Sequence, residues 1–396
     1  MAPTSVLFAD ADSKGPTMHH ICSVVPAGSL PAAILILICL SSSLAQGQFS
    51  DSGAPVPLKD HVSSLAFAAD GSLLAGAGLD KIRVWEMKES QLLRTITTGG
   101  PGIADIEFSP QAGLLAAGCA DGKVRLWNTE TGQLIKTLDA GDDSTYFVLF
   151  SPDGKLLAST HRRHPDCGAD GKATAQLRLW DVARGAVLRT LVDGEADFVA
   201  SPAFSSEGRQ LAAVMRWGVD APGCSEIRFW NVDNDSPARR LSLDPTNVQL
   251  LRFLPDSQSL VTVGRRTERA CTVREMARWD LQSGKAFWWI EELHSGFHDI
   301  AVSPDGLAIA SIGIGPWKSP RWRDIRPVTS GSEFVLRNAA SGRVLARAEG
   351  EGDGRTGVAF SPDGTLLATC DDRQVALRDA KTGSVQQVLW PFPGTP

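Results

Sequence analysis

The sequence contains a single Tyr and no long apolar segment. Its longest apolar run, Pro31 to Leu40, is shorter than the roughly 20 residues that a membrane-spanning helix needs, which excludes a protein with several such helices. Positive charge is not in excess either, because 45 acidic residues outnumber 39 basic ones and the net charge is −6. A sequence-independent nucleic-acid binder needs a strongly basic surface, so we expect no nucleic-acid partner. With 43% hydrophobic residues the chain can bury a core, which excludes intrinsic disorder.

The short motifs of common catalytic and metal sites are also missing. The sequence has no Gly-x-Ser-x-Gly elbow, no His-Glu-x-x-His pair, no phosphate-binding loop and no dinucleotide-binding glycine pattern. Its seven Cys form no Cys-x-x-Cys pair, which excludes a zinc ribbon, a thioredoxin-type site and c-type haem attachment. We therefore expect a protein that is not an enzyme and holds no cofactor or metal.

Residues 1–45 have the features of a signal peptide. The apolar run is followed by small residues that end at Ala45, as before a cleavage site. The residues before the run carry more Asp than Lys, although export signals favour positive charge. We predict export to the periplasm, the cell envelope or the medium. The mature chain would start near Gln46, have a segment 46–61 before the first repeat and not be an integral membrane protein. The alternative is an uncleaved N-terminus on a cytoplasmic protein.

A motif recurs seven times along the rest of the chain. Each copy has an aromatic or aliphatic anchor residue followed by Ser-Pro-Asp-Gly or a variant of it, at intervals of 41 to 58 residues. The anchors are Phe67, Phe108, Phe150, Phe204, Phe253, Val302 and Phe360. Seven units therefore run from Val62 to Trp390, and regular recurrence at this spacing predicts a repeat architecture.

Each unit has the pattern of four short strands. An apolar strand leads into the motif, where Asp153, Asp305 and Asp363 recur in register and are interpreted as turn formers. The second strand, such as 156–159, is apolar throughout, as expected for a strand covered on both faces. The third strand, such as 177–180, alternates aliphatic residues with Arg, which predicts that the Arg side chains face solvent. A turn closed by Gly leads to the fourth strand.

These signals together resemble the WD-repeat family of β-propellers. The resemblance rests on Phe-Ser-Pro-Asp-Gly, Leu-Leu-Ala and Leu-Trp-Asp, as at 150–154, 156–158 and 179–181, and covers residues 62–390. It implies an all-β fold: a seven-bladed β-propeller of four-stranded antiparallel blades, followed by a tail at 391–396.

The chain departs from the family pattern in several repeats. The third strand ends in Trp in five units, but Arg337 and Arg378 stand there in the last two. The Gly-His pair that precedes the first strand in many members has no clear counterpart. The family's hydrogen-bonded tetrad of Asp, His, Ser or Thr, and Trp is therefore not expected to be complete in most blades. The last blade can be completed by residues 384–390, and a contribution from 54–59 is left open.

Four neighbouring units carry long insertions between their second and third strands. The insertions cover 161–176, 215–226, 264–275 and 313–333, where the other units have only a few residues. They hold twelve basic and eight acidic residues, although the chain as a whole is acidic. The resemblance implies that all four emerge on one face of the propeller, and insertions on one face are where repeat proteins commonly bind.

Basic and aromatic residues of these insertions are the candidate binding residues, because Trp and Arg are enriched at binding hot spots. They are Arg162, Arg163, His164, Arg216, Trp217, Arg265, Arg266, Arg269, Trp317, Lys318, Arg321, Trp322 and Arg323. We predict a partner with an acidic surface, either a protein segment or an anionic polymer such as a glycan. In the alternative interpretation these Arg side chains are solvated or pair with Asp166, Glu268 and Asp324, and the Trp side chains pack the loops.

Five cysteines lie in the predicted mature chain. Cys167, Cys224 and Cys271 fall in three consecutive insertions, and we predict one disulfide, between Cys224 and either Cys167 or Cys271. A metal site at these thiolates is an alternative that their spacing does not match. Cys119 and Cys370 end second strands and are expected to be small buried residues.

The sequence as a whole predicts a monomeric, non-catalytic binding scaffold that uses the positively charged face of its insertions. One alternative is an exported enzyme, such as a hydrolase or a lactonase-like catalyst, with a site assembled in the propeller channel. His294, His298 and Asp299 are the compact cluster that would serve it. The other alternative is an intracellular WD-repeat adaptor. An enzyme would bind a small molecule in the channel, whereas a scaffold would lose its partner when the insertions change.

Overall fold

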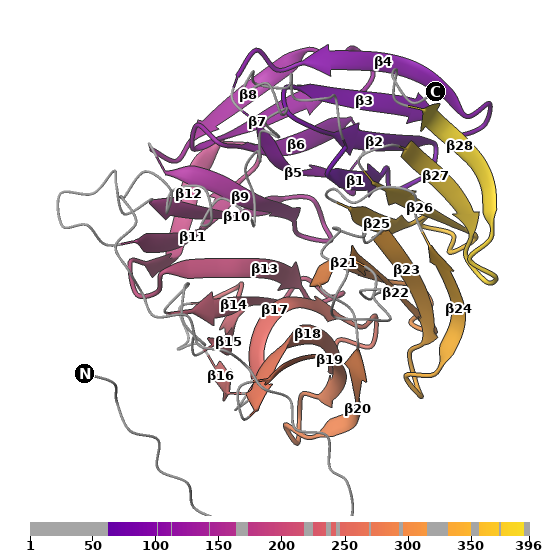
Figure 1. Cartoon of the computed structure of the whole chain (residues 1–396). Coiled ribbons are helices and arrows are strands. Elements are labelled where there is room, and N and C mark those ends of the chain that lie inside the picture. The colour runs from indigo at the N-terminus through magenta and orange to yellow at the C-terminus, as the bar shows by residue number, and fades with distance from the viewer. Residues whose placement is uncertain are drawn as a thin grey trace, which may run out of the picture.

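The structure, a computed structural model, describes residues 62–391 except 101, 112, 142, 164–172, 218–224, 235–238, 243–245, 269–270, 293–295, 315–331, 350–355 and 372–373. In this part of the chain the regular elements are strands, and they form seven four-stranded antiparallel sheets. Figure 1 shows these sheets as blades arranged in a ring. The predicted all-β, seven-bladed propeller is confirmed. Within the described ranges, no helix is long and apolar enough to cross a membrane.

The strands of each blade follow one another in sequence from the centre of the ring to its rim. Blade 1 contains β1 (Ser64–Phe67), β2 (Leu73–Ala77), β3 (Lys81–Glu86) and β4 (Gln91–Thr97). Blade 2 contains β5 (Ile103–Phe108), β6 (Leu114–Cys119), β7 (Lys123–Asn128) and β8 (Leu134–Asp139). Blade 3 contains β9 (Ser144–Phe150), β10 (Leu156–Arg163), β11 (Thr174–Asp181) and β12 (Ala186–Asp193). Blade 4 contains β13 (Phe198–Phe204), β14 (Gln210–Arg216), β15 (Ser225–Asn231) and β16 (Arg239–Ser242).

The other three blades repeat this order. Blade 5 contains β17 (Thr246–Phe253), β18 (Ser259–Glu268), β19 (Cys271–Asp280) and β20 (Ala286–Glu292). Blade 6 contains β21 (Gly296–Val302), β22 (Ala308–Ile314), β23 (Ser332–Asn338) and β24 (Val344–Glu349). Blade 7 contains β25 (Gly357–Phe360), β26 (Leu366–Cys370), β27 (Gln374–Asp379) and β28 (Val385–Pro391). The outer strand of blade 7 therefore comes from the C-terminal end of the repeats, and residues 54–59 lie outside the described residues.

The core consists of apolar seams between neighbouring blades. Each inner strand contacts the inner strand of the next blade, and β25 contacts β1, which closes the ring. A buried cluster lies between each pair of neighbours; Trp85 and Leu74 of blade 1, for example, pack with Val375 and Leu377 of blade 7. Every blade thus buries both faces of its inner strands, and this burial is the main stabilising contribution of such a fold.

The turn after each anchor is formed as the motif predicts. In blade 3 the Asp153 carboxylate accepts hydrogen bonds from the Ser151 hydroxyl at 2.7 Å and from the Lys155 backbone N at 3.1 Å. Gly154 has a φ of 69°, a left-handed conformation that glycine adopts without strain. Asp305 and Asp363 make the same contacts in blades 6 and 7, so the interpretation of these residues as turn formers is confirmed.

Two expectations about the strands are wrong. Arg83 and Arg228 of the third strands are only 4% and 7% exposed, because the neighbouring blade covers the face that the alternation assigned to solvent. The insertion at 264–275 is not a long loop but an extension of the hairpin of β18 and β19, whose pairing continues to Glu268 opposite Cys271. Its backbone hydrogen bonds are therefore satisfied within the sheet.

The two cysteines that end second strands are buried as predicted. Cys119 is 0% exposed and Cys370 is 2% exposed, and both are free thiols. Burial raises the pKa of both thiols, which keeps them protonated and unreactive at neutral pH.

Candidate functional site

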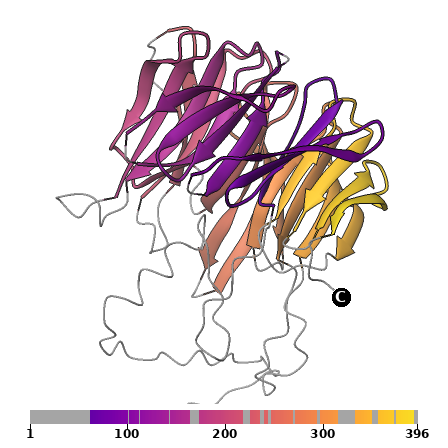
Figure 2. The same ribbon diagram turned by 90° about the horizontal axis from the view of Figure 1, so that it is seen from above.

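The second strands end on one face of the ring, because the repeated antiparallel blades make them all run in the same direction. The four insertions follow the ends of β10, β14, β18 and β22, so they leave from this one face, which we call the insertion face. Figure 2 shows the blades from the side, with their strands running between the two faces of the ring. The opposite face carries the turns between the first and second strands and between the third and fourth strands.

Three arginines occupy the same strand position in three consecutive blades. Each anchor Phe of blades 3, 4 and 5 pairs with a Leu of the second strand, and these pairs fix the register. Five residues after that Leu stand Arg162 in blade 3, Arg216 in blade 4 and Arg265 in blade 5. Their counterparts in the other blades are Leu79, Ala120, Ile314 and Asp372. The repeat geometry therefore directs three guanidinium groups to the insertion face side by side.

An aromatic ring lies between two of these arginines. The guanidinium carbons of Arg162 and Arg216 stand 5.6 Å and 5.8 Å from the ring centre of Phe198, which pairs directly with Arg216 across the sheet. Tyr146 meets Phe198 edge to face at 5.2 Å. Arg162 and Phe198 are each 8% exposed, and the buried Nε atoms of Arg162 and Arg216 have no hydrogen-bond partner. Two positive charges are thus held on apolar packing without a neutralising contact.

Arg265 and Arg274 extend this group into blade 5. They are opposite each other in the register of β18 and β19, where like charges repel. With the Gln249 amide turned so that its oxygen faces Arg265, that oxygen accepts from Nε at 3.0 Å and from Nη2 at 2.9 Å, which gives this arginine a neutral partner. Arg162, Arg216, Arg265 and Arg274 are called the arginine cluster below.

Burial and mutual repulsion act on the charges of the arginine cluster. Burial, followed by the charges of Arg265 and Arg162, lowers the pKa of Arg216. Burial and the charge of Arg265 lower the pKa of Arg274 to about 10. Both groups stay protonated at neutral pH, and the direction of both shifts shows that their environment does not compensate their charge.

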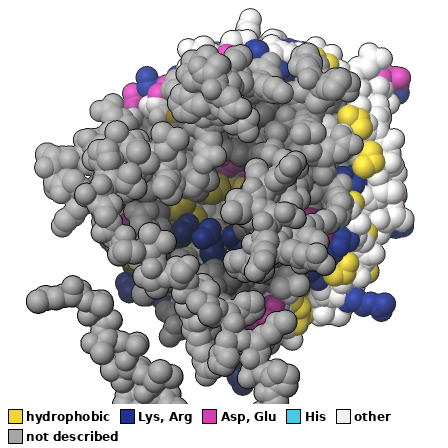
Figure 3. Space-filling model, in the orientation of Figure 1, with side chains coloured by type: hydrophobic (Ala, Val, Ile, Leu, Met, Phe, Trp, Pro, Cys, Tyr) yellow, Lys and Arg dark blue, Asp and Glu magenta, His cyan; other side chains and the backbone are white. Residues whose placement is uncertain are grey.

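Three acidic side chains of blades 3 and 4 form ion pairs with other arginines. Asp143 pairs with Arg163 at 3.2 Å, and both Glu195 and Glu226 pair with Arg228. Among the described residues, no carboxylate forms an ion pair with the arginine cluster. In Figure 3, Lys and Arg side chains are visible near the centre of the face turned toward the viewer, beside hydrophobic side chains. N–H groups placed in this way can donate to an oxyanion.

Two further predicted residues are held by local contacts. Arg163 points away from the arginine cluster and forms its ion pair with Asp143. Trp217 is half-buried; its Nε1 donates to the backbone oxygen of Glu195 at 2.8 Å, and Arg228 lies 5.8 Å above its ring. For Trp217, the alternative interpretation of an aromatic that packs its own loop agrees with these contacts.

The other predicted residues cannot be placed by their side chains. Arg266 and Cys271 belong to β18 and β19, but their side chains lie outside the described residues. Wholly outside the described residues are His164, Cys167, Cys224, Arg269, Trp317, Lys318, Arg321, Trp322 and Arg323. The disulfide thus stays a prediction. Groups of His, Cys, Asp and Glu that could hold a metal ion are absent from the described ranges.

Sequence reasoning missed four residues of the site. Phe198, Tyr146 and Gln249 come from the first strands and not from the insertions, and Arg274 lies in an insertion but was not singled out. The recurrence of Arg five residues after the paired Leu is visible in the sequence once the strand register is known. Phe198, Tyr146 and Gln249 show no such recurrence.

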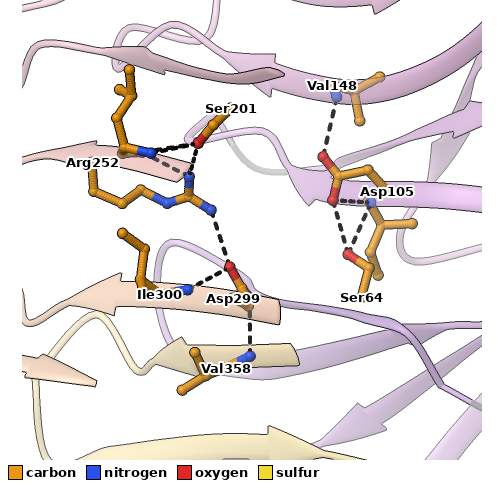
Figure 4. Close-up of polar contacts among 10 residues, drawn as sticks. Ser64, Asp105, Val148, Ser201, Arg252, Asp299, Ile300 and Val358 are labelled. Atoms are coloured by element: carbon orange, nitrogen blue, oxygen red, sulfur yellow. Dashed lines mark hydrogen bonds and ion pairs between the residues drawn. The ribbon is translucent and has the colours of Figure 1, made fainter. Parts of the chain in front are cut away.

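The channel side of the ring has polar contacts of another kind. In several blades, the residue three positions before the anchor accepts a hydrogen bond, through its side chain, from a backbone N–H of a strand in the next blade. Asp105 Oδ2 accepts from Val148 at 3.1 Å, and Asp299 Oδ2 accepts from Val358 at 3.0 Å (Figure 4). Asp299 also pairs with Arg252 at 3.3 Å. These carboxylates therefore join blades 2 to 3 and 6 to 7.

Serines make the same link at two other seams. Ser64 accepts from the backbone N of Ile106 in blade 2 at 3.2 Å, and Ser201 accepts from that of Leu251 in blade 5 at 2.9 Å. Removal from bulk water raises the pKa of Asp105 to about 6 and also raises that of Asp299. The alternative of an enzyme named His294, His298 and Asp299 as a catalytic cluster. Of these, Asp299 joins two blades, and His298 Nδ1 lies 3.0 Å from the Thr356 hydroxyl. His294 lies outside the described residues.

Comparisons with known proteins agree with this geometry. The family model of the WD domain, G-beta repeat, matches residues 56–86 and 343–379, and that of the anaphase-promoting complex subunit 4 WD40 domain matches residues 83–152. The mouse (Mus musculus) protein "WD repeat-containing protein 90" is 31% identical over 111 residues. Residues 56–152 and 343–379 are therefore similar to WD40 repeats. The aligned part is 28% of this chain and only 6% of the mouse protein's length. WD40 propellers generally serve as protein-interaction scaffolds and are typically not catalytic.

Part of the WD40 tetrad is present here, as a hydrogen bond from a third-strand side chain to a hydroxyl group of the second strand. In blade 3 Trp180 Nε1 donates to Ser159 Oγ at 2.6 Å, and Ser159 and Thr145 flank His161 at 2.6 Å and 3.0 Å. Burial, together with the charge of Arg178, lowers the pKa of His161 to about 3, so it is neutral at physiological pH. The histidine comes from β10, and not from the connection before the first strand.

Other blades retain or lose this contact according to the residue in the second strand. Trp279 donates to Thr262 at 2.8 Å in blade 5, and in blade 7 Arg378 Nε donates to Thr369 at 3.1 Å in place of Trp. In blade 1 Gly76 stands at this position, and the buried Nε1 of Trp85 has no partner.

A pair of Trp→Phe variants tests this difference. Trp180→Phe is expected to cost about 1 kcal/mol more than Trp85→Phe, because it removes a hydrogen bond and leaves the Ser159 hydroxyl short of a donor. Both variants lose the same side-chain volume, so the loss of packing is comparable. Denaturant unfolding measures the two free energies; equal destabilisation would contradict the role given to the contact.

Proposed function

We propose that this WD40 propeller is a non-catalytic scaffold that binds an acidic partner on its insertion face. Within this proposal, the arginine cluster forms the floor of the binding surface. The insertion residues add to it from blades 3 to 6. They are His164, Arg266, Arg269, Trp317, Lys318, Arg321, Trp322 and Arg323. The partner is a protein segment or another anionic polymer, and the scaffold itself is a monomer exported by means of residues 1–45.

The observation that carries the proposal is the absence of a counter-charge for buried arginines within the described residues. Arg162 is 8% exposed, and among the described residues neither it nor Arg216 forms an ion pair with a carboxylate. An unpaired buried charge lowers the stability of a fold, so an arginine that serves structure alone is normally paired. An arriving acidic group would supply the missing charge, and the gain would appear as binding energy.

Affinity capture with two matched variants tests the proposal. The triple-Met variant carries Arg162→Met, Arg216→Met and Arg265→Met, which keeps the apolar stems and removes three charges. The control variant carries Lys155→Met, Arg184→Met and Arg209→Met on the opposite face, where these side chains are 74%, 78% and 75% exposed. Each is immobilised without residues 1–45 and exposed to envelope and cytoplasmic extracts of the source cells.

We expect the wild-type chain and the control variant to retain the same partner and the triple-Met variant to lose at least nine-tenths of it. Capture that is equal for all three would show that the partner uses another surface. The extract in which the partner is found, together with the N-terminal sequence of the native protein, tests export. A native chain that keeps its first 45 residues would contradict it.

A further inference from the structure

We infer that the arginine cluster is a site for a phosphoryl group, such as a phosphorylated side chain of the partner. This inference rests on the proposed function and narrows it from an acidic surface to one chemical group. It takes its support from four guanidinium groups that form no ion pair with a described carboxylate, from the burial of Arg162 and from the Phe198 ring that Arg162 and Arg216 share.

The charge of the cluster favours a group with more than one negative charge. Four guanidinium groups approach one another without a carboxylate among the described residues, and Arg265 acts on both Arg216 and Arg274. A single carboxylate would offset one of these charges. A phosphate monoester carries between −1.5 and −2 at neutral pH and presents three strong acceptor oxygens, so one group can meet several arginines at once.

The donors of the cluster suit tetrahedral oxygens. The guanidinium groups of Arg162 and Arg216 both lie over the Phe198 ring, and their buried Nε atoms have no acceptor. A guanidinium group offers a fork of N–H donors that matches phosphate geometry, and its terminal nitrogens can meet an oxyanion that arrives from the insertion face. Contact with the ring restricts the two side chains before binding, which lowers the side-chain entropy lost when an oxyanion binds.

The depth of the site favours the tip of a side chain over a flat acidic surface. Arg162 and Phe198 are each only 8% exposed, so this part of the site lies below the surface, whereas Arg265 is exposed. A phosphate at the end of a Ser, Thr or Tyr side chain can reach below the surface, whereas carboxylates spread along a rigid surface would stay above it. Free phosphate has the same chemistry, and the experiment separates the two sources.

Calorimetric titration of residues 46–396 in phosphate-free buffer tests the inference. The probes are inorganic phosphate, a tripeptide Gly-phosphoserine-Gly, hexaglutamate and sodium acetate, all at one ionic strength because such binding is screened by salt. We expect both phosphoryl probes to bind at least tenfold more tightly than acetate, and the phosphotripeptide more tightly than hexaglutamate. The triple-Met variant should lose at least tenfold in affinity for phosphate, and the control variant should retain it.

The outcomes separate this inference from the proposed function. If inorganic phosphate alone binds, the phosphoryl site stands and its ligand is a free ion. If hexaglutamate binds more tightly than the phosphoryl probes and loses affinity in the triple-Met variant, the phosphoryl inference is overturned while the acidic partner remains. If no probe binds, or binding is unchanged in the triple-Met variant, the inference fails. The capture experiment then decides the proposed function by itself.

Discussion

Gly122→Ala is expected to lower the free energy of unfolding by about 3–5 kcal/mol, although it adds only one methyl group. Gly122 has a φ of +77°, and a Cβ atom there would lie 2.2 Å from the backbone oxygen of Gly141 and 2.6 Å from that of Asp143. Both oxygens belong to the connection that leads into blade 3. Because they are backbone atoms, they cannot rotate away, and the strain of a left-handed alanine is added to the displacement of that connection.

Gly99→Ala provides the matched control. Gly99 also has a left-handed conformation, with a φ of +64°, but its added Cβ would meet nothing within 4 Å. Its cost should be limited to the conformational term of about 1–2 kcal/mol. Chemical denaturation of both variants measures the difference. Equal losses of stability would contradict the close contact between Gly122 and the backbone oxygens of Gly141 and Asp143.

Asp299→Ala is expected to cost about 3 kcal/mol. The Asp299 carboxylate accepts from the backbone N of Ile300 at 2.8 Å and from that of Val358 at 3.0 Å, and it pairs with Arg252. Removing it leaves two backbone donors and a cation without this acceptor. Each unsatisfied donor costs about 1–3 kcal/mol, and the cost is reduced here because the Asp299 side chain is 26% exposed.

Asp299→Asn should lie between the wild type and Asp299→Ala. The amide keeps one oxygen for Ile300 and Arg252 and turns its NH₂ group toward the Val358 N–H, so one of the contacts is lost. Thermal or denaturant unfolding of the three proteins gives the order. An Asp299→Ala variant as stable as the wild type would show that the carboxylate is not a link between blades 6 and 7, which would reopen a chemical role for it.

The fold could be predicted because its signals repeat. Seven anchors, the turn residues after them and the apolar second strands each occur at a constant place in the unit, so an error in one repeat is corrected by the others. The burial of Arg83 and Arg228 could not be predicted in this way. Alternation along a strand shows which residues share a face, but not that a neighbouring blade covers both faces.

The candidate site was predicted only in part for the same reason. Arg162, Arg216 and Arg265 were singled out because they lie in or beside insertions, whereas their equivalence becomes clear only from the pairing of Leu157, Leu211 and Leu260 with the anchors. Phe198 of blade 4 reaches Arg162 of blade 3 across a blade boundary. Contacts of this kind depend on how the ring closes, which no local pattern in the sequence contains.

The channel shows that a repeated position can remain unnoticed when its residue type varies. Asp105, Asp299, Ser64 and Ser201 all stand three residues before an anchor and all accept from the next blade. Sequence reasoning considered Asp299 alone, next to His298, and so as part of a catalytic cluster. Its equivalence with two serines explains it better as one member of a set of structural links.

Comparing the free energy of unfolding of the wild-type chain and the triple-Met variant shows directly whether the cluster serves binding or structure. If the arginines are kept for a partner, their mutual repulsion and missing acceptors lower the stability of the free protein. The triple-Met variant should then be at least as stable as the wild type in phosphate-free buffer. A loss of more than about 1 kcal/mol, against no change in the control variant, would mean that these arginines stabilise the fold and would contradict a binding role.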